Sequence, residues 1–358
     1  MPAQLDIATV REHRIRAAFV AVTLAAPVII IVTVAQPLLV YSLTLATFGL
    51  AHVLSELRYV DRRFSRSLER RELVAIAVLL LGALAARISG VSGLVGIGTA
   101  LPVELGFVVA MALSVARGSL AQRGLAATIG TALGAATFAA PFDTAVSLSI
   151  LHNLTPLAFL WELAPRRSRT IIILVASIVF VALPLLVATG LPRLVLQTWL
   201  PATSALDPLA AGPLASQLYV YVPSPLLHRA EAIDLFSASV VAQCAHYAAV
   251  IIVLPTMLAA RDPEAQGIVP WPKGVIFAAL LAAASAFAAY RFSLGFVSAR
   301  ALYAIAASVH AWIEVPLIVI ALSRGTDQPS SSSPTLAEAA LASAETASAR
   351  RAASPQPQ

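Results

Sequence analysis

Apolar stretches about as long as a lipid bilayer is thick recur along most of this chain. A helix that crosses a bilayer needs about 20 mostly apolar residues, each adding 1.5 Å of rise. We place ten such segments, at 17–34, 38–57, 72–89, 93–115, 124–140, 143–163, 171–190, 232–258, 274–290 and 299–322. The sequence therefore predicts an all-α, polytopic integral membrane protein, a helical bundle of about ten transmembrane helices.

The composition excludes the other fold classes. Of the 358 residues, 59% are hydrophobic and 12% are charged, whereas roughly a quarter are charged in a soluble domain. Abundant alanine and glycine suit close packing of helices in lipid, and the strand-length alternation of a β-barrel is missing. The single cysteine, Cys244, excludes an internal disulfide framework and a cysteine-rich metal site.

The loops predict the domain organisation and the topology. We expect one transmembrane domain over residues 1–324, followed by a disordered, Ser- and Ala-rich cytoplasmic tail over 325–358. Arginines gather before the first segment and after the second, fourth and sixth, so the positive-inside rule places both termini in the cytoplasm of a bacterium, below its inner membrane. The net charge of +6 then reflects topology, and no nucleic acid partner is expected. Arg291 and Arg300 are exceptions on the outer side.

The outer connection at 191–231 is far longer than the others. Its prolines and the aromatic residues Trp199, Tyr219 and Tyr221 are typical of a surface loop anchored by aromatic rings, and also of a lid that lies at the membrane surface. The sequence leaves both interpretations open.

Ionisable residues at membrane depth occur in every second predicted segment. They are His52, Glu56, Glu104, His152, His246, His310 and Glu314. Counted from the outer ends of the five segments, the histidines and one glutamate lie about 10 to 15 residues deep, a spread of about 7 Å. Because an ionisable group in hydrocarbon costs on the order of 2.5 to 3.5 kcal/mol, we expect them to share a partner.

The spacing of these residues favours a metal ion as that partner. His52 with Glu56, and His310 with Glu314, are four residues apart and lie on one helix face. An imidazole and a carboxylate so placed can bind a metal together, or the carboxylate can orient the imidazole. We therefore predict that all seven residues are metal ligands, supported from outside by Asn153, which adjoins His152, and by Tyr247.

Two other interpretations remain open at this stage. Some of the histidines could bind haem, or the histidines and glutamates could form the proton or cation pathway of a membrane transporter. Histidine and carboxylate ligands without cysteine favour zinc, iron or manganese, and iron suits an oxidative role best. The chain lacks a P-loop, a G-x-S-x-G nucleophile elbow and an H-E-x-x-H motif. No catalytic residue is assigned.

Four windows around the histidines carry a family resemblance. AHVLSE, LHNLTPLAFL, QCAHYAAVIIVLP and VHAWIEVPLIVI resemble the histidine-bearing helices of integral-membrane non-haem iron oxygenases, in particular the bacterial carotenoid-cleaving family called Brp/Blh. The resemblance implies four iron ligands, His52, His152, His246 and His310, and an oxygen-dependent reaction on a long apolar molecule. The chain lacks that family's Gly-His-Gly-Ala-x-Asp type of segment at the first histidine.

These observations lead to one functional expectation. The protein should be a metal-dependent oxidoreductase or oxygenase with non-haem iron, acting on a lipid-soluble molecule such as a carotenoid, an isoprenoid, a quinone or a fatty acyl chain. Its partners would be that molecule and the membrane lipids, and the substrate would enter sideways from the bilayer.

Overall fold

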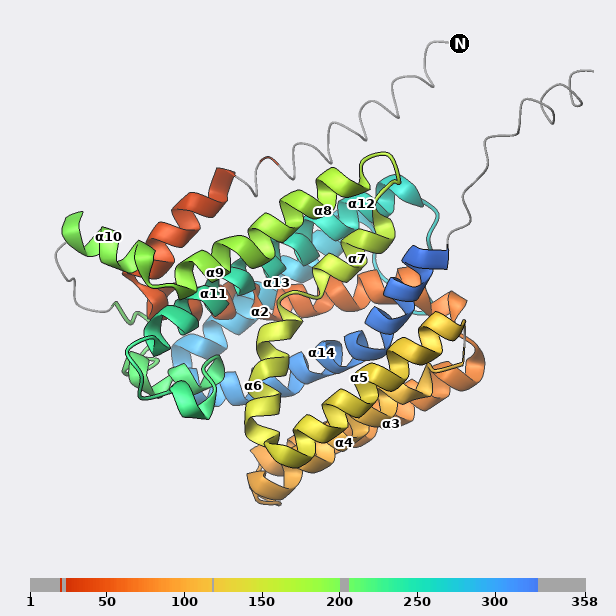
Figure 1. The fold of residues 1–358 in the computed structure, drawn as a ribbon, viewed down its shortest axis with the longest axis horizontal. Coiled ribbons are helices and arrows are strands. Elements are labelled where there is room, and N and C mark those ends of the chain that lie inside the picture. Colours follow the sequence, from red (N-terminus) through yellow and green to blue (C-terminus); the bar gives the residue numbers. More distant parts are fainter. Residues whose placement is uncertain (1–19, 21–23, 118, 200–205, 328–358) are drawn as a thin grey trace, which may run out of the picture.

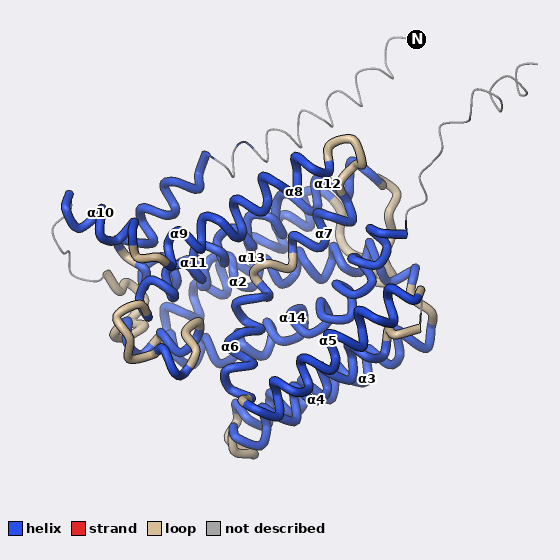
Figure 2. Tube along the Cα trace, in the orientation of Figure 1, coloured by secondary structure: helices blue, strands red, loops and turns tan. Residues whose placement is uncertain are grey.

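The computed structural model describes residues 20, 24–117, 119–199 and 206–327, and this part of the chain contains helices and no strand (Figures 1 and 2). Its main helices are α2 (Pro37–Phe64), α3 (Arg70–Val91), α4 (Ile97–Ser114), α5 (Leu120–Ala139), α6 (Pro141–His152), α7 (Pro156–Leu163), α8 (Arg169–Ser177), α9 (Leu183–Ala188), α10 (Leu191–Trp199), α11 (Ala232–Ala248), α12 (Leu254–Arg261), α13 (Gly274–Leu294) and α14 (Phe296–Asp327). Eight helical segments within the described residues are long and apolar enough to cross a membrane. The predicted all-α, polytopic membrane bundle is confirmed.

Two of the ten expected spans are not among these eight segments. The fifth is the helix α5, which is long enough, but Gln122 and Arg123 near its start lower its hydropathy. The first appears as the short apolar helix Leu24–Ala35, and most of the rest of that expected segment lies outside the described residues. The described part of the chain thus holds eight clear candidate spans, fewer than the sequence predicts.

The expected boundary between the bundle and the tail does not coincide with a helix end. α14 continues through Asp327, three residues past the predicted limit at 324. Residues 1–19 and 328–358, which include both termini and the predicted tail beyond Asp327, lie outside the described residues.

α14 is at the centre of the bundle and touches α2, α3, α4, α5, α7 and α13. Figure 1 shows α3, α4 and α5 together on one side of α14, with α8, α9 and α11 on the opposite side and α6 crossing between the two groups. Long polar side chains carried by α14 can therefore meet residues from both halves of the chain.

The predicted span 143–163 is interrupted in the middle. α6 ends at His152 and α7 begins at Pro156. A proline has no N–H and its ring collides with the carbonyl four residues earlier, which here belongs to His152. The Thr155 hydroxyl lies 2.8 Å from that carbonyl oxygen and can satisfy it. The break places the His152 side chain at a helix end inside the bundle.

The predicted span 232–258 contains a π-helical turn just after His246. α11 carries His246 and passes into a π-helical segment, Ala249–Val253, before α12. Pro255 again explains the irregularity, since it can neither donate to the preceding turn nor fit against it. The Ser55 hydroxyl of α2 donates to the Val250 carbonyl at 2.9 Å. Such π-helical turns are frequent at functional sites.

Residues 206–231 of the long outer connection pack into the protein, whereas its first part, residues 191–199, forms α10, which has no buried residue. Leu218, Tyr221 and Val222 are buried in one hydrophobic cluster with Tyr41 and Phe236. This packing favours the anchored loop over the lid. Residues 200–205 lie outside the described part of the connection.

Candidate metal centre

Five of the seven predicted ligands meet inside the bundle. They are His52 and Glu56 of α2, His152 at the end of α6, His246 of α11 and His310 of α14. One ligand atom from each residue can be chosen so that all five atoms lie within 4.8 Å of one another. Four helices that are distant in sequence thus bring imidazoles and a carboxylate to one point, and this buried group can hold a metal ion.

The hydrogen bonds of two histidines indicate which ring nitrogen carries the proton. His52 Nδ1 lies 3.3 Å from the Phe48 carbonyl oxygen, and His152 Nδ1 lies 2.5 Å from Glu314 Oε2. A carbonyl or carboxylate oxygen only accepts, so both Nδ1 atoms carry the proton. In a neutral imidazole, Nε2 then presents a lone pair.

Both lone pairs face the same atom. The Nε2 atoms of His52 and His152 each lie 3.1 Å from His310 Nε2. A single N–H on His310 can point at only one of them with good geometry. A metal ion with bonds of about 2.0 to 2.1 Å separates neighbouring ligands by about 3.0 to 3.4 Å. A bound cation would therefore satisfy all three nitrogens at their present spacing.

Glu56 supplies the carboxylate of the group. Its side chain is 0% exposed and neither carboxylate oxygen has a hydrogen-bond partner among the described residues. Its nearest neighbours of opposite polarity are His246 Nε2 at 3.4 Å and His310 Nε2 at 3.9 Å. A buried carboxylate without a partner costs several kcal/mol. A metal ion would supply the missing positive charge.

Glu314 lies outside this group of donors. Its Oε2 accepts the hydrogen bond from His152, and its Oε1 lies 2.8 Å from the Thr155 hydroxyl. The predicted pairing of Glu314 with His310 on the same helix is thereby replaced by a contact between α14 and α6. Glu314 orients a candidate ligand, which is the second of the two roles that the spacing allowed.

Glu104 also lies outside the group, which corrects its assignment as a ligand. Its Oε1 accepts from Arg87 Nε at 2.9 Å and from Trp312 Nε1 at 2.6 Å. Arg87 of α3 supplies the positive charge that we expected from a metal. The signal in the sequence was Arg87 itself, which lies within the predicted segment 72–89.

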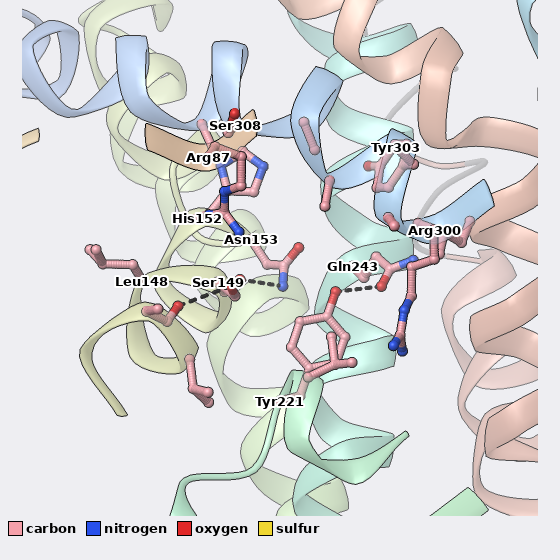
Figure 3. A pocket seen from close by; sticks show the side chains of 18 of the residues that line it. Arg87, Leu148, Ser149, His152, Asn153, Tyr221, Gln243, Arg300, Tyr303 and Ser308 are labelled. Atoms are coloured by element: carbon pink, nitrogen blue, oxygen red, sulfur yellow. Dashed lines mark hydrogen bonds between the residues drawn. The ribbon is translucent and has the colours of Figure 1, made fainter. Parts of the chain in front are cut away.

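The two residues predicted to support the ligands differ in position. The Tyr247 ring is stacked on His52, with centroids 4.2 Å apart and the planes at 30°. Asn153 instead donates to the Ser149 carbonyl of its own segment, at 3.1 Å. Tyr247 therefore contacts a candidate ligand, whereas Asn153 faces the neighbouring cavity (Figure 3).

A cavity of about 490 Å³ adjoins the centre. His52, His152 and His310 are on its wall, while His246 and Glu56 lie behind them. Its border includes three exposed apolar side chains from three helices, Phe142 of α6, Ile97 of α4 and Val297 of α14. A cation held by the five donors would have one side open to an apolar space with an apolar entrance.

Sequence reasoning missed several residues on this wall. Gln243 precedes His246 by three positions and so lies on the same helix face, which was an available signal. Tyr303 and Tyr41 also line the cavity; they precede His310 and His52 by seven and eleven residues, about two and three helical turns, so the same face pattern was present for them too.

Comparison of the chain with protein-family models, with curated proteins and with solved structures finds no match. The resemblance of the four histidine windows to the Brp/Blh family stays a prediction. What the centre does has to follow from its own geometry and chemistry.

We expect Glu314→Gln to weaken metal binding by about 10- to 100-fold, the usual effect of losing a carboxylate that orients a histidine ligand. A glutamine accepts the Nδ1 proton of His152 less strongly because it carries no charge. Competition against a chelator of known affinity measures the change. Glu231→Gln, on the exposed start of α11, is the control, and equal affinities for the two variants would contradict this role.

Proposed function

We propose that this protein is an integral membrane, metal-dependent oxidoreductase that acts on a lipid-soluble molecule with non-haem iron at the centre. One observation carries the proposal: four imidazoles and an unpartnered carboxylate converge at the inner wall of an apolar cavity. The proposal includes a location in the bacterial inner membrane with both termini in the cytoplasm, for which the arginine-rich loops are the support.

The donor set supports iron without haem. Nitrogen and oxygen ligands with no cysteine suit iron, zinc or manganese, and iron bound here would supply the activation of dioxygen, the proposed oxidant. A haem ring takes up the equatorial positions of its iron. Here five donors from four helices, all within 4.8 Å of one another, leave no room for such a ring between them.

The position of each residue relative to the cavity indicates its role in the proposal. His246 and Glu56 would hold the cation from behind, and His52, His152 and His310 would hold it from the side that faces the cavity. Trp312 and Tyr247 belong to the wall that surrounds the reacting molecule and excludes water. The apolar border between α6 and α14 suits entry from the lipid.

Elemental analysis of the detergent-purified protein tests the proposal. We expect about one iron per chain, no Soret band in the visible spectrum, and oxygen uptake when β-carotene, a ubiquinol or oleic acid is supplied. A Soret band would contradict the non-haem assignment, and a metal-free protein would contradict the centre. Proton movement by metal-free protein in liposomes would support the transporter instead.

A further inference from the structure

Arg300 is a positive charge on the wall of the cavity. It lies near the start of α14, and its outer position is one of the two exceptions to the positive-inside rule. Figure 3 shows Arg300 extending from α14 on the side of the cavity where Tyr221 and Gln243 lie, away from His152. Neither the metal centre nor the topology explains why an arginine is there.

The partners of Arg300 are neutral. Its guanidinium donates to the Gln217 side-chain oxygen and to the Tyr219 hydroxyl, and it lies 5.1 Å from the centroid of the Tyr219 ring. The ion pairs within the described residues do not include Arg300. Arg87, the other arginine on the cavity wall, is by contrast neutralised by Glu104.

The surroundings of Arg300 can receive an anion. An arginine has five N–H donors in a fork that matches a carboxylate, and the contacts with Gln217, with Tyr219 and with the Tyr41 hydroxyl use only some of them. The Tyr219 hydroxyl accepts from Arg300 and keeps a proton of its own to donate. Tyr221 beside them donates to Gln243 Oε1 at 2.6 Å, and burial raises the pKa of Tyr221 well above its ordinary value. An anion would thus meet donors and no competing negative charge.

We infer that Arg300 binds the carboxylate of a long-chain amphiphile, and that the apolar chain of this molecule extends through the cavity to the histidines. The inference rests on the proposed function and narrows its substrate to a fatty-acid type of molecule. A carboxylate stays at the membrane surface while its chain occupies the hydrocarbon, and the cavity offers the same order of groups, from a cation at one end to apolar walls farther in.

The helix sets the length of that chain. Arg300 and His310 are ten residues apart on α14, which corresponds to about 15 Å along its axis. An extended chain covers about 1.2 Å per bond. Because the Arg300 side chain extends away from His152, the carbon atoms next to the histidines would lie at least about twelve bonds from the carboxylate.

Photo-crosslinking of the full-length protein in phosphatidylcholine nanodiscs tests the inference. The probe is an 18-carbon fatty acid with a diazirine at carbon 12, compared with its methyl ester. Labelling of cavity-lining peptides from α6 and α14 is read by mass spectrometry. We expect Arg300→Gln, and the ester with the unchanged protein, each to need about tenfold more probe for equal labelling, since a charged hydrogen bond is lost.

Two further variants test whether the effect of Arg300→Gln comes from the loss of the positive charge at this position. Arg300→Lys keeps the charge and should recover part of the labelling. Arg229→Gln removes an exposed arginine of the outer connection 191–231. Arg229 does not line the cavity, so this variant should label like the unchanged protein. The comparison of acid with ester needs no variant, so it remains informative if Arg300→Gln folds poorly.

Equal labelling by acid and ester, or no labelling of the cavity by the acid, would overturn the inference. The experiment is run on chelator-treated and on iron-loaded protein, because probe binding at Arg300 does not require the metal. Acid-selective labelling of a protein that neither holds metal nor consumes oxygen would refute the proposed function alone. Oxygen uptake with an uncharged polyene, undiminished in Arg300→Gln, would refute the inference alone.

Discussion

Replacing His310 with alanine is expected to abolish metal binding and, with it, substrate-dependent oxygen uptake. His310 Nε2 lies 3.1 Å from the corresponding atoms of both His52 and His152, so it belongs to every close pair of nitrogens on the cavity side. Four-ligand metal sites bind with apparent free energies of about 10 to 16 kcal/mol, which corresponds to a loss of at least about a hundredfold in affinity per ligand. Metal content after dialysis measures the effect.

Glu56→Gln should have a similar effect, because the cation loses the buried negative charge behind it. Glu104→Gln is the matched control, since Glu104 is also a buried glutamate, carried by α4, with 2% exposure. The control should keep its metal, as Glu104 is bonded to Arg87 and Trp312. Full metal content in both His310→Ala and Glu56→Gln would refute the centre. Elution as a single species shows that each variant is folded.

Replacing Arg87 with methionine is expected to destabilise the bundle by about 3 kcal/mol, the lower part of the range for removing one partner of a buried ion pair. Glu104 is almost fully buried, and without Arg87 only the Trp312 indole remains as a donor to it. Arg87 itself is partly exposed, with 22% of its side chain accessible, so the lower value applies. Reversible unfolding in detergent with increasing dodecyl sulfate measures the change.

The double variant Arg87→Met with Glu104→Gln should recover most of that stability, because the uncompensated carboxylate is gone. The two single variants and the double variant form a thermodynamic cycle that isolates the coupling between the two residues. A stability of Arg87→Met within about 0.5 kcal/mol of the unchanged protein would show that the pair contributes little. Metal content should be equal in all four proteins.

The sequence predicts which histidines form the site, but it does not predict which carboxylate joins them. Depth along a helix is a local property, so counting residues placed His52, His152, His246 and His310 in one layer, and the structure brings them together. Which carboxylate joins them is not local. Glu56 and Glu314 each follow a histidine by four residues, yet Glu56 meets the four histidines and Glu314 meets His152, while Glu104 meets Arg87.

The pattern of apolar segments is enough to predict a membrane bundle whose histidines lie at a common depth. In lipid every backbone group must be bonded within the chain, so long apolar segments have to be helices, and 1.5 Å per residue then sets the depth of each side chain. Which of these side chains touch depends on how the helices pack in three dimensions. The rotation of each helix about its axis depends on packing against several neighbours at once, and the breaks at Pro156 and Pro255 redirect two of the four histidine-bearing spans. The cavity, and the arginine on its wall, exist only between helices and therefore have no counterpart in any single segment.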